Sequence, residues 1–218
     1  IDNNLPGSEL SIGTDTALNV IVEAMDKIKE SGIASRRCFV VETMGRDCGY
    51  LALMSGIAAG AERIYTNEDG ISLDDLANDV HWLRESFAHG RRLFLAVRNE
   101  NASHNYTTDF IARLLEEESH GMYDVRQVVL GHMQQGGSPS PFDRLLANRL
   151  GYRALNLIDD ELAAHQDGSW FIGVNESGMR PCSMDTMPSL IDAAHRRPRE
   201  QWWLQLRTIA RMVSDEVR

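Results

Sequence analysis

The chain has 218 residues, of which 43% are hydrophobic and 25% charged, values that are ordinary for a globular protein with a substantial core. Its formal net charge of -10 argues against nucleic acid or an anionic membrane as the main partner, because both would repel it. No apolar run approaches the roughly 18 residues of a membrane span, so no membrane segment is expected. Three cysteines without metal-like spacing are typical of a reduced, cytoplasmic setting.

Apolar periodicity predicts strands and helices in alternation. Compact apolar runs indicate buried strands, and apolar residues at helical spacing, such as Leu73, Leu76 and Val80, indicate helices. Ser72 and Asp75 resemble a capping box that uses Asp in place of Glu. In chain order, the expected elements are a strand at 37–41, a helix at 48–61, a strand at 63–66, a helix at 72–89, a strand at 92–97, a helix at 108–119, a strand at 127–130, a helix at 141–158, a strand at 170–174 and a helix at 199–217.

The alternation predicts an α/β fold, a doubly wound parallel sheet with helices on both faces. Its strands lack strict apolar–polar alternation, which is typical of strands buried on both sides. In such sheets ligands bind beyond the carboxyl ends of the strands, so the loops at 42–49, 98–107 and 131–139 are expected to matter. Residues 159–197, punctuated by Gly, Pro and Asp, are expected to be loops around one short strand.

These three loops carry polar side chains suited to phosphate and sugar oxygens. Gly45 lets the backbone approach a ligand, and Arg46 can bind phosphate with its forked donors. Residues 98–101 offer donors and acceptors for hydroxyl groups. His132 lies in a glycine-bearing loop before a helix N-terminus, which favours an anion. Singly, each loop is also compatible with a solvated turn, with Arg46 paired to Asp47 or Glu42, but three loops at one sheet edge favour a site.

Long motifs in matching order resemble the 6-phosphofructokinase family over nearly the whole chain. The closing motif resembles the C-terminal half of the duplicated eukaryotic enzymes, as do residues 98–100 and 105–110. The motifs are Ile1-Asp2-Asn3-Asn4, Met44-Gly45-Arg46, Gly131-His132-Met133-Gln134-Gln135-Gly136-Gly137, Phe142-Asp143-Arg144 and His195-Arg196-Arg197-Pro198-Arg199-Glu200-Gln201-Trp202-Trp203.

The resemblance implies a phosphotransferase of glycolysis. It implies that ATP, with Mg²⁺, phosphorylates the 1-hydroxyl of fructose 6-phosphate to give fructose 1,6-bisphosphate. It also implies an allosteric, cytoplasmic homo-oligomer, a dimer or tetramer, without nucleic acid or membrane partners. Asp2 matches the aspartate that takes the proton from the sugar 1-hydroxyl, which is general base catalysis.

The resemblance also assigns a set of substrate- or effector-binding positions. Arg37, Arg126 and His132 match residues that hold the sugar phosphate, and the two arginines often reach across a subunit interface. Glu100 matches the acid that binds sugar hydroxyls, and Arg196 matches an arginine that closes over the phosphate. No metal ligand is expected in this chain. The full set is Asn4, Arg37, Met44, Gly45, Arg46, Glu100, Arg126, His132, Met133, Gln134, Gln135 and Arg196.

Four positions leave the kind of site open. Asp2 and Arg46 are typical of catalytic halves. Regulatory halves usually carry Ser at the position of Asp2 and often lack Arg at the position of Arg46. Asn4 and Gln135 stand where catalytic halves carry a second aspartate and an arginine. The site therefore either phosphorylates fructose 6-phosphate or is a regulatory site for fructose 2,6-bisphosphate. A pyrophosphate-dependent relative is a third alternative.

The family's glycine-rich ATP loop has no counterpart in this sequence. The chain starts at Ile1 without Met or a signal peptide, which indicates a start within a domain. We expect residues 1–14 and 132–188 to be the remainder of an incomplete ATP-side domain, and residues 15–131 and 189–218 to form the sugar-phosphate domain. Alone, the chain is expected to be inactive, to bind the sugar phosphate poorly and ATP hardly at all, and to leave a sheet edge exposed.

Overall fold

A four-stranded parallel sheet organises the fold. The computed structural model describes residues 2–32, 34–165 and 167–213. The sheet has the order β2-β3-β1-β4, and its strands are β1 (Arg37–Thr43), β2 (Arg63–Tyr65), β3 (Leu93–Asn99) and β4 (Asp124–Val129). Thr43 of β1 aligns with Asn99 of β3, and Glu42 aligns with Val129 of β4. The carboxyl ends of three strands therefore meet at one edge, as predicted.

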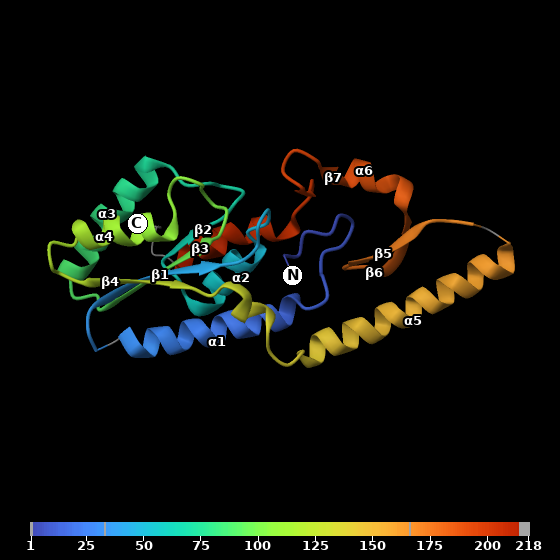
Figure 1. Ribbon diagram of the computed structural model, residues 1–218, viewed down its shortest axis with the longest axis horizontal. Coiled ribbons are helices and arrows are strands. Elements are labelled where there is room, and N and C mark those ends of the chain that lie inside the picture. The colour runs from blue at the N-terminus through green and yellow to red at the C-terminus, as the bar shows by residue number, and fades with distance from the viewer. Residues whose placement is uncertain (1, 33, 166, 214–218) are drawn as a thin grey trace.

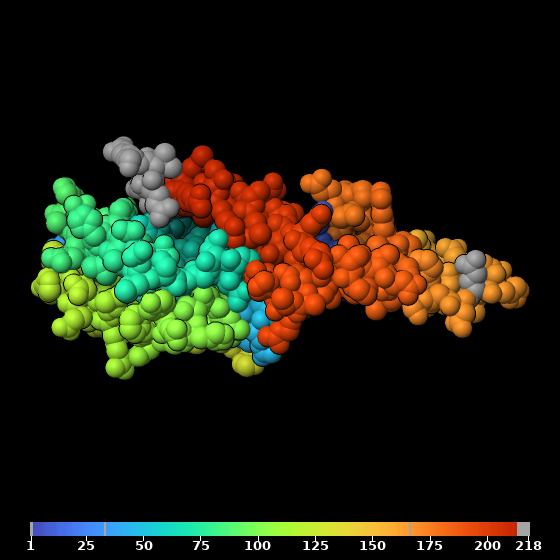
Figure 2. Space-filling model, turned by 90° about the horizontal axis from the view of Figure 1, so that it is seen from above, coloured from blue at the N-terminus to red at the C-terminus, as the bar shows by residue number. Residues whose placement is uncertain are grey.

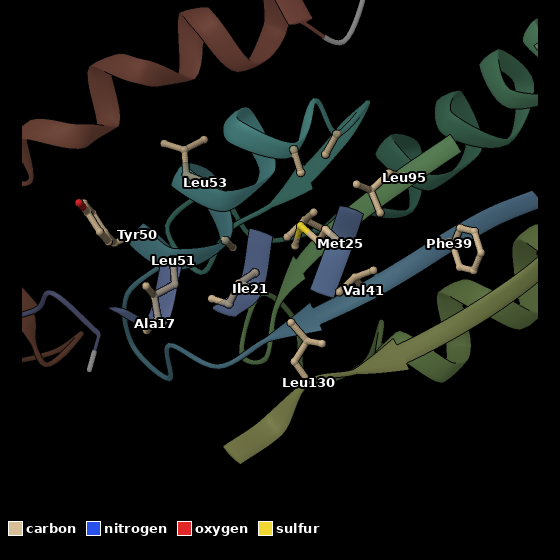
Figure 3. Close-up of a cluster of buried hydrophobic side chains, with 14 of the residues drawn as sticks. Ala17, Ile21, Met25, Phe39, Val41, Tyr50, Leu51, Leu53, Leu95 and Leu130 are labelled. Carbon is tan, nitrogen blue, oxygen red and sulfur yellow. The ribbon is translucent and has the colours of Figure 1, made fainter. Parts of the chain in front are cut away.

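Helices cover both faces of this sheet. One face packs against α1 (Thr14–Gly32), α2 (Tyr50–Ala59), the 3-10 helix η3 (Trp202–Leu206) and α7 (Arg207–Val213). The other packs against α3 (Leu73–Ala88) and α4 (Thr108–Glu117). Side chains alternate along a strand, so neighbouring residues of β1 enter different cores. Phe39 and Val41 enter the core on the side of α1 and α2, shown in Figure 3, while Cys38 and Val40 enter the core on the side of α3 and α4. The predicted doubly wound sheet is confirmed.

Small residues let α2 lie close to the sheet, as its composition predicts. A Cβ atom added to Gly56 would lie 2.5 Å from Ile64 Cδ1, far inside van der Waals contact. Ser55 on the same helix is fully buried, and its hydroxyl donates to the Leu51 carbonyl (2.6 Å). The close approach therefore depends on the absence of a side chain at position 56.

The rest of the chain extends away from the sheet, so that the molecule is elongated (Figure 1). A 24-residue helix, α5 (Pro141–Ala164), leads to an antiparallel hairpin of β5 (Trp170–Asn175) and β6 (Gly178–Ser183). After η2 (Met184–Thr186) and α6 (Met187–Leu190), a second hairpin follows, formed by β7 (Ile191–Asp192) and β8 (Arg197–Pro198). In the described part of the chain, no helix combines the length and hydrophobicity that crossing a membrane requires.

Several expectations for secondary structure need correction. The strand expected at 170–174 belongs to an antiparallel hairpin rather than to a parallel sheet, because Gly178, with φ +112°, allows a tight turn after β5. Residues 159–197 are not mainly loops, since α5 continues to Ala164. The helix expected at 199–217 is a 3-10 helix followed by α7 within the described residues, and 214–217 lie outside them. Helix α1 was not expected at all.

The capping box at the start of α3 is confirmed. Ser72 Oγ accepts from the Asp75 N–H (3.1 Å), and Asp75 Oδ2 accepts from the Ser72 N–H (2.9 Å). We expect Ser72→Ala to lower the free energy of unfolding by about 1 kcal/mol, because the Asp75 N–H loses its partner. Urea unfolding followed by circular dichroism measures this. Ser86→Ala, inside the same helix, is the control and should leave stability unchanged or slightly higher; equal effects of the two changes would contradict a capping role.

Candidate functional site

The loop after β1, residues 44–48, is held in a defined shape by buried polar groups. Gly45 has φ +134°, a conformation that other residues rarely adopt, and a Cβ there would lie 2.6 Å from the Cys48 carbonyl oxygen. Asn99, buried at the end of β3, donates from Nδ2 to the carbonyls of Gly45 (2.6 Å) and Cys48 (3.2 Å). The end of β3 therefore fixes the loop that follows β1.

Two further side chains join the three predicted loops. The Met44 N–H donates to Gln134 Oε1 (2.9 Å), and the Gly45 N–H donates to Glu100 Oε1 (3.1 Å). Gln134 is 1% exposed, whereas Glu100 is half-buried. The expected convergence of the loops after β1, β3 and β4 is thus present in the structure, and Glu100 Oε2 has no hydrogen bond within the described residues.

The loop after β4 folds into a short 3-10 helix, η1 (Gly131–Gln135). His132, Met133 and Gln135 are exposed on it, and the His132 ring makes no hydrogen bond with the described residues. Gln134 alone turns inward, toward the Met44 N–H. Donors for a ligand at this loop are therefore the His132 ring and the Gln135 amide.

The helix N-terminus expected after the His132 loop is that of α5, and it is capped by a side chain of its own segment. Ser140 caps α5 by accepting from the Asp143 N–H (3.2 Å). The Asp143 carboxylate in turn accepts from the N–H groups of Gly13 and Thr16 (both 2.8 Å), where α1 begins. That carboxylate occupies the positive end of α1 and not that of α5, so an anion site at the start of α5 stays a prediction.

The N-terminal segment reaches the same loop. Asn3 is buried with φ +55°, and its side chain donates to the Glu9 carbonyl and accepts from the Ser11 N–H (both 2.8 Å). Its own carbonyl lies 3.9 Å from Cys48 Sγ. Asp2 and Asn4 flank this anchor and are half-buried. Asp2 is thereby placed beside the loop after β1.

Cys48 lies in this loop but is no nucleophile. Burial raises the pKa of its thiol to about 12, and the negative charges of Glu68 and Asp2 add to the rise. The thiol is therefore neutral at pH 7, and a neutral thiol is a poor nucleophile. The chemistry of the site falls to its carboxylate, imidazole and guanidinium groups.

Arg98 and Asn99 do not bind a ligand, contrary to the interpretation of residues 98–101 as hydroxyl-binding. Both are buried, with 1% and 0% exposure. Arg98 donates to Glu42 Oε2 (2.9 Å) and to the carbonyl of Ser103 (2.6 Å). These contacts shape the loop after β3, whose Glu100 keeps one carboxylate oxygen without a hydrogen bond in the described part of the chain.

The hairpin at residues 191–198, called here the C-terminal hairpin, packs beside the first loop. Arg196 Nη2 donates to Asp47 Oδ1 (3.1 Å), and Arg197 Nη1 donates to Asn67 Oδ1 (2.7 Å). Figure 2 shows the C-terminal segment, in red, lying along the surface of the residues in turquoise.

The alternative in which Arg46 pairs with Asp47 or Glu42 is wrong. Glu42 binds Arg98, Asp47 binds Arg196, and the Arg46 side chain is exposed.

Arg37 and Arg126 lie away from this cluster. Arg37 is the first residue of β1, at the edge opposite to the loops, about 20 Å along the strand from Thr43 at roughly 3.3 Å per residue. Arg126 is exposed on β4 and donates to the Val125 carbonyl (2.8 Å). Within one chain, Arg37 is therefore too far along β1 to reach these loops.

Glu68 is a central residue that the sequence interpretation missed. Its side chain is 3% exposed, accepts from the Gly49 N–H (3.0 Å) and from Gln201 Nε2 (2.9 Å), and lies 3.6 Å from Arg197 Nη1. It thereby joins α2, the C-terminal hairpin and the segment before η3. Nothing near Glu68 in the sequence signals these partners, since they are 19 to 133 residues away.

A metal centre was not expected in this chain. Across residues 2–32, 34–165 and 167–213, no three His, Cys, Asp or Glu side chains gather into a group able to hold a metal ion. The donor groups of the described residues therefore do not fit a Mg²⁺ site of their own.

Comparison with known proteins agrees with this architecture. The phosphofructokinase family model matches residues 1–158. The chain is 43% identical over 98% of its length to the human ATP-dependent 6-phosphofructokinase, muscle type, and equally to the ATP-dependent 6-phosphofructokinase of Dictyostelium discoideum, covering 29% and 26% of those proteins. It therefore spans less than a third of the length of these relatives.

Solved structures give the same result. The phosphofructokinase of Saccharomyces cerevisiae matches 99% of this chain, with 30% of its own chain covered, a TM-score of 0.93 and 35% identity. The T-state phosphofructokinase of Pichia pastoris matches all of it, with 27% covered, a TM-score of 0.91 and 34% identity. Because the family model matches residues 1–158, and both a relative that is 43% identical and a solved structure with a TM-score of 0.93 match almost the whole length of this chain, the chain belongs to the phosphofructokinase family.

Proposed function

We propose that this chain provides the fructose 6-phosphate site of an ATP-dependent 6-phosphofructokinase. One observation carries the proposal: the loops after β1, β3 and β4 are joined by direct hydrogen bonds from Met44 and Gly45 to Gln134 and Glu100. The names of the relatives supply the reaction, transfer of a phosphoryl group from ATP to fructose 6-phosphate. In glycolysis this reaction gives fructose 1,6-bisphosphate.

Each group in the cluster has chemistry that the reaction needs. Asp2 is a carboxylate that can take the proton of the sugar 1-hydroxyl as it attacks phosphorus. Glu100 can accept hydrogen bonds from sugar hydroxyls through its unused oxygen. Arg46, His132 and Arg196 are exposed donors that can hold the 6-phosphate, where charge-assisted bonds are strong.

The remaining contacts are proposed to come from outside this copy of the chain. Arg37 and Arg126 would serve the site of a neighbouring subunit in a homo-oligomer, a dimer or tetramer. ATP and Mg²⁺ belong to the complete enzyme, in which the metal would neutralise phosphate charge. Free cysteines support a cytoplasmic enzyme: Cys38, Cys48 and Cys182 form no disulfide.

The domain division also stays a proposal. Residues 15–131 and 189–218 would form the sugar-phosphate domain, which contains the parallel sheet and the C-terminal hairpin. Residues 1–14 and 132–188 would belong to the ATP-side domain, which agrees with the position of α5 and the β5–β6 hairpin beyond the sheet (Figure 1).

Removal of single phosphate donors tests the proposed site. His132→Ala and Arg46→Ala, in the protein at its full natural length, are each expected to weaken fructose 6-phosphate binding about tenfold, because each removes a charge-assisted or imidazole donor. Isothermal titration calorimetry measures the affinity. Arg113→Ala is the control, since this exposed arginine pairs with Asp109 on α4 (2.9 Å). Unchanged affinity in both site variants would rule out this phosphate position.

A further inference from the structure

We propose that Asp47 is a positioning residue, which orients the Arg196 guanidinium toward the 6-phosphate of the sugar. The inference rests on the proposed function and adds to it a residue that the family resemblance does not assign. It starts from one contact between distant parts of the chain: Arg196 Nη2 donates to Asp47 Oδ1 at 3.1 Å across 149 residues.

Asp47 has little freedom to move, because the backbone on both sides of it is fixed. The Arg46 carbonyl accepts from Asn67 Nδ2 (3.3 Å), and the Cys48 N–H donates to the Gly45 carbonyl (2.9 Å). The side chain of Asp47 is only 20% exposed. The carboxylate therefore stands at a defined point beside Arg46, a proposed phosphate donor.

The backbone of Arg196 is equally fixed, but its side chain is not. Arg196 lies in the turn of the C-terminal hairpin with φ +53°. Its neighbour Arg197 binds Asn67 and approaches Glu68, and Pro198 is buried. The Arg196 side chain is 67% exposed, however, and Asp47 is its one ion-pair partner in the described part of the chain. Without Asp47, this long side chain would be free to take many rotamers.

The geometry of the contact leaves the rest of the guanidinium available. Arginine carries five N–H donors, and Asp47 contacts the nitrogen Nη2 alone. Nε and Nη1 keep their donors for a second anion, since the described residues offer them no acceptor. An aspartate that blocked the phosphate would instead be expected to engage both arms of the fork. The one-armed contact favours orientation of Arg196 over competition with phosphate.

Pre-orientation of this kind improves binding, because less side-chain freedom is lost when the ligand arrives. In the protein at its full natural length, Asp47→Asn is expected to weaken fructose 6-phosphate binding about fivefold. The Michaelis constant for fructose 6-phosphate should rise by the same factor with kcat unchanged, since the 6-phosphate is held equally in the ground and transition states. Calorimetry measures the affinity for fructose 6-phosphate, and steady-state kinetics measures the Michaelis constant and kcat.

A double-mutant cycle separates orientation from general damage to the loop. Arg196→Ala is expected to weaken binding, and Asp47→Asn should then have no further effect in that background. Asp26→Asn, which removes an exposed contact to Lys29 on α1 (3.3 Å), is the control and should change neither constant. Equal losses from Asp47→Asn with and without Arg196 would overturn the proposal.

Other outcomes are equally decisive. Tighter binding in Asp47→Asn would show that Asp47 competes with the phosphate, and unchanged binding would show that it does not act on Arg196 at all; either overturns the proposal. If Asp47→Asn and Arg196→Ala are both silent while Arg46→Ala weakens binding, the positioning role fails and the proposed function stands. If none of the three changes affects binding, the phosphate site itself is misplaced.

Discussion

Replacing Arg98 by alanine is expected to lower the free energy of unfolding by about 3–5 kcal/mol, because a buried guanidinium would be removed and the largely buried carboxylate of Glu42 would lose its cation. The Arg98 side chain is 2% exposed and its partner Glu42 is 21% exposed, with Arg98 Nη1 2.9 Å from Glu42 Oε2. Arg98 also donates to the carbonyls of Glu100 (3.0 Å), Ser103 (2.6 Å) and Tyr106 (3.2 Å). These backbone acceptors would lose their donor in the same change.

Urea unfolding followed by circular dichroism measures the loss, with Arg113→Ala as the matched control. Arg113 also pairs with an aspartate, but its side chain is 81% exposed, so its removal should cost less than about 1 kcal/mol. A loss of the same small size for Arg98→Ala would contradict a structural role for the buried pair. Because Arg98 shapes the loop that holds Glu100, weaker sugar-phosphate binding by the variant is expected as well.

Local signals explain why much of the fold could be predicted. The capping box at Ser72 and Asp75 uses residues three apart, so it is visible in the sequence. Strands β1 and β3 are compact apolar runs, and parallel strands necessarily bring their carboxyl ends to one edge. The α1 helix could also have been found: Ala17, Ile21 and Met25, all buried, are spaced by four residues.

Features that depend on distant partners could not be predicted in this way. Strand β6, with its proline and few apolar residues, is a strand because β5 pairs with it. Arg98 is of a residue type that is usually exposed, and its burial depends on Glu42, 56 residues away. The contact between Asp47 and Arg196 likewise follows from how the C-terminal hairpin packs, which no neighbouring residue encodes.

Replacing Asp2 by asparagine, in the protein at its full natural length, should have the largest effect on activity. We expect kcat to fall by on the order of 10²–10⁴-fold, because asparagine cannot take the proton from the sugar hydroxyl. Fructose 6-phosphate affinity should change little, since the phosphate donors Arg46, His132 and Arg196 remain. Steady-state kinetics gives kcat, and calorimetry gives the affinity.

The position of Asp2 argues that this loss reflects chemistry rather than misfolding. Its neighbour Asn3 holds the segment through Glu9 and Ser11, and none of these contacts uses the Asp2 carboxylate. Asp26→Asn is the control and should keep full turnover. If Asp2→Asn also keeps turnover but alters the response to fructose 2,6-bisphosphate, the site would be a regulatory one. Gln135 is present in both Asp2→Asn and the control Asp26→Asn. Any difference in turnover or in effector response between these two proteins therefore reports on the carboxylate at position 2 and not on the residue at position 135.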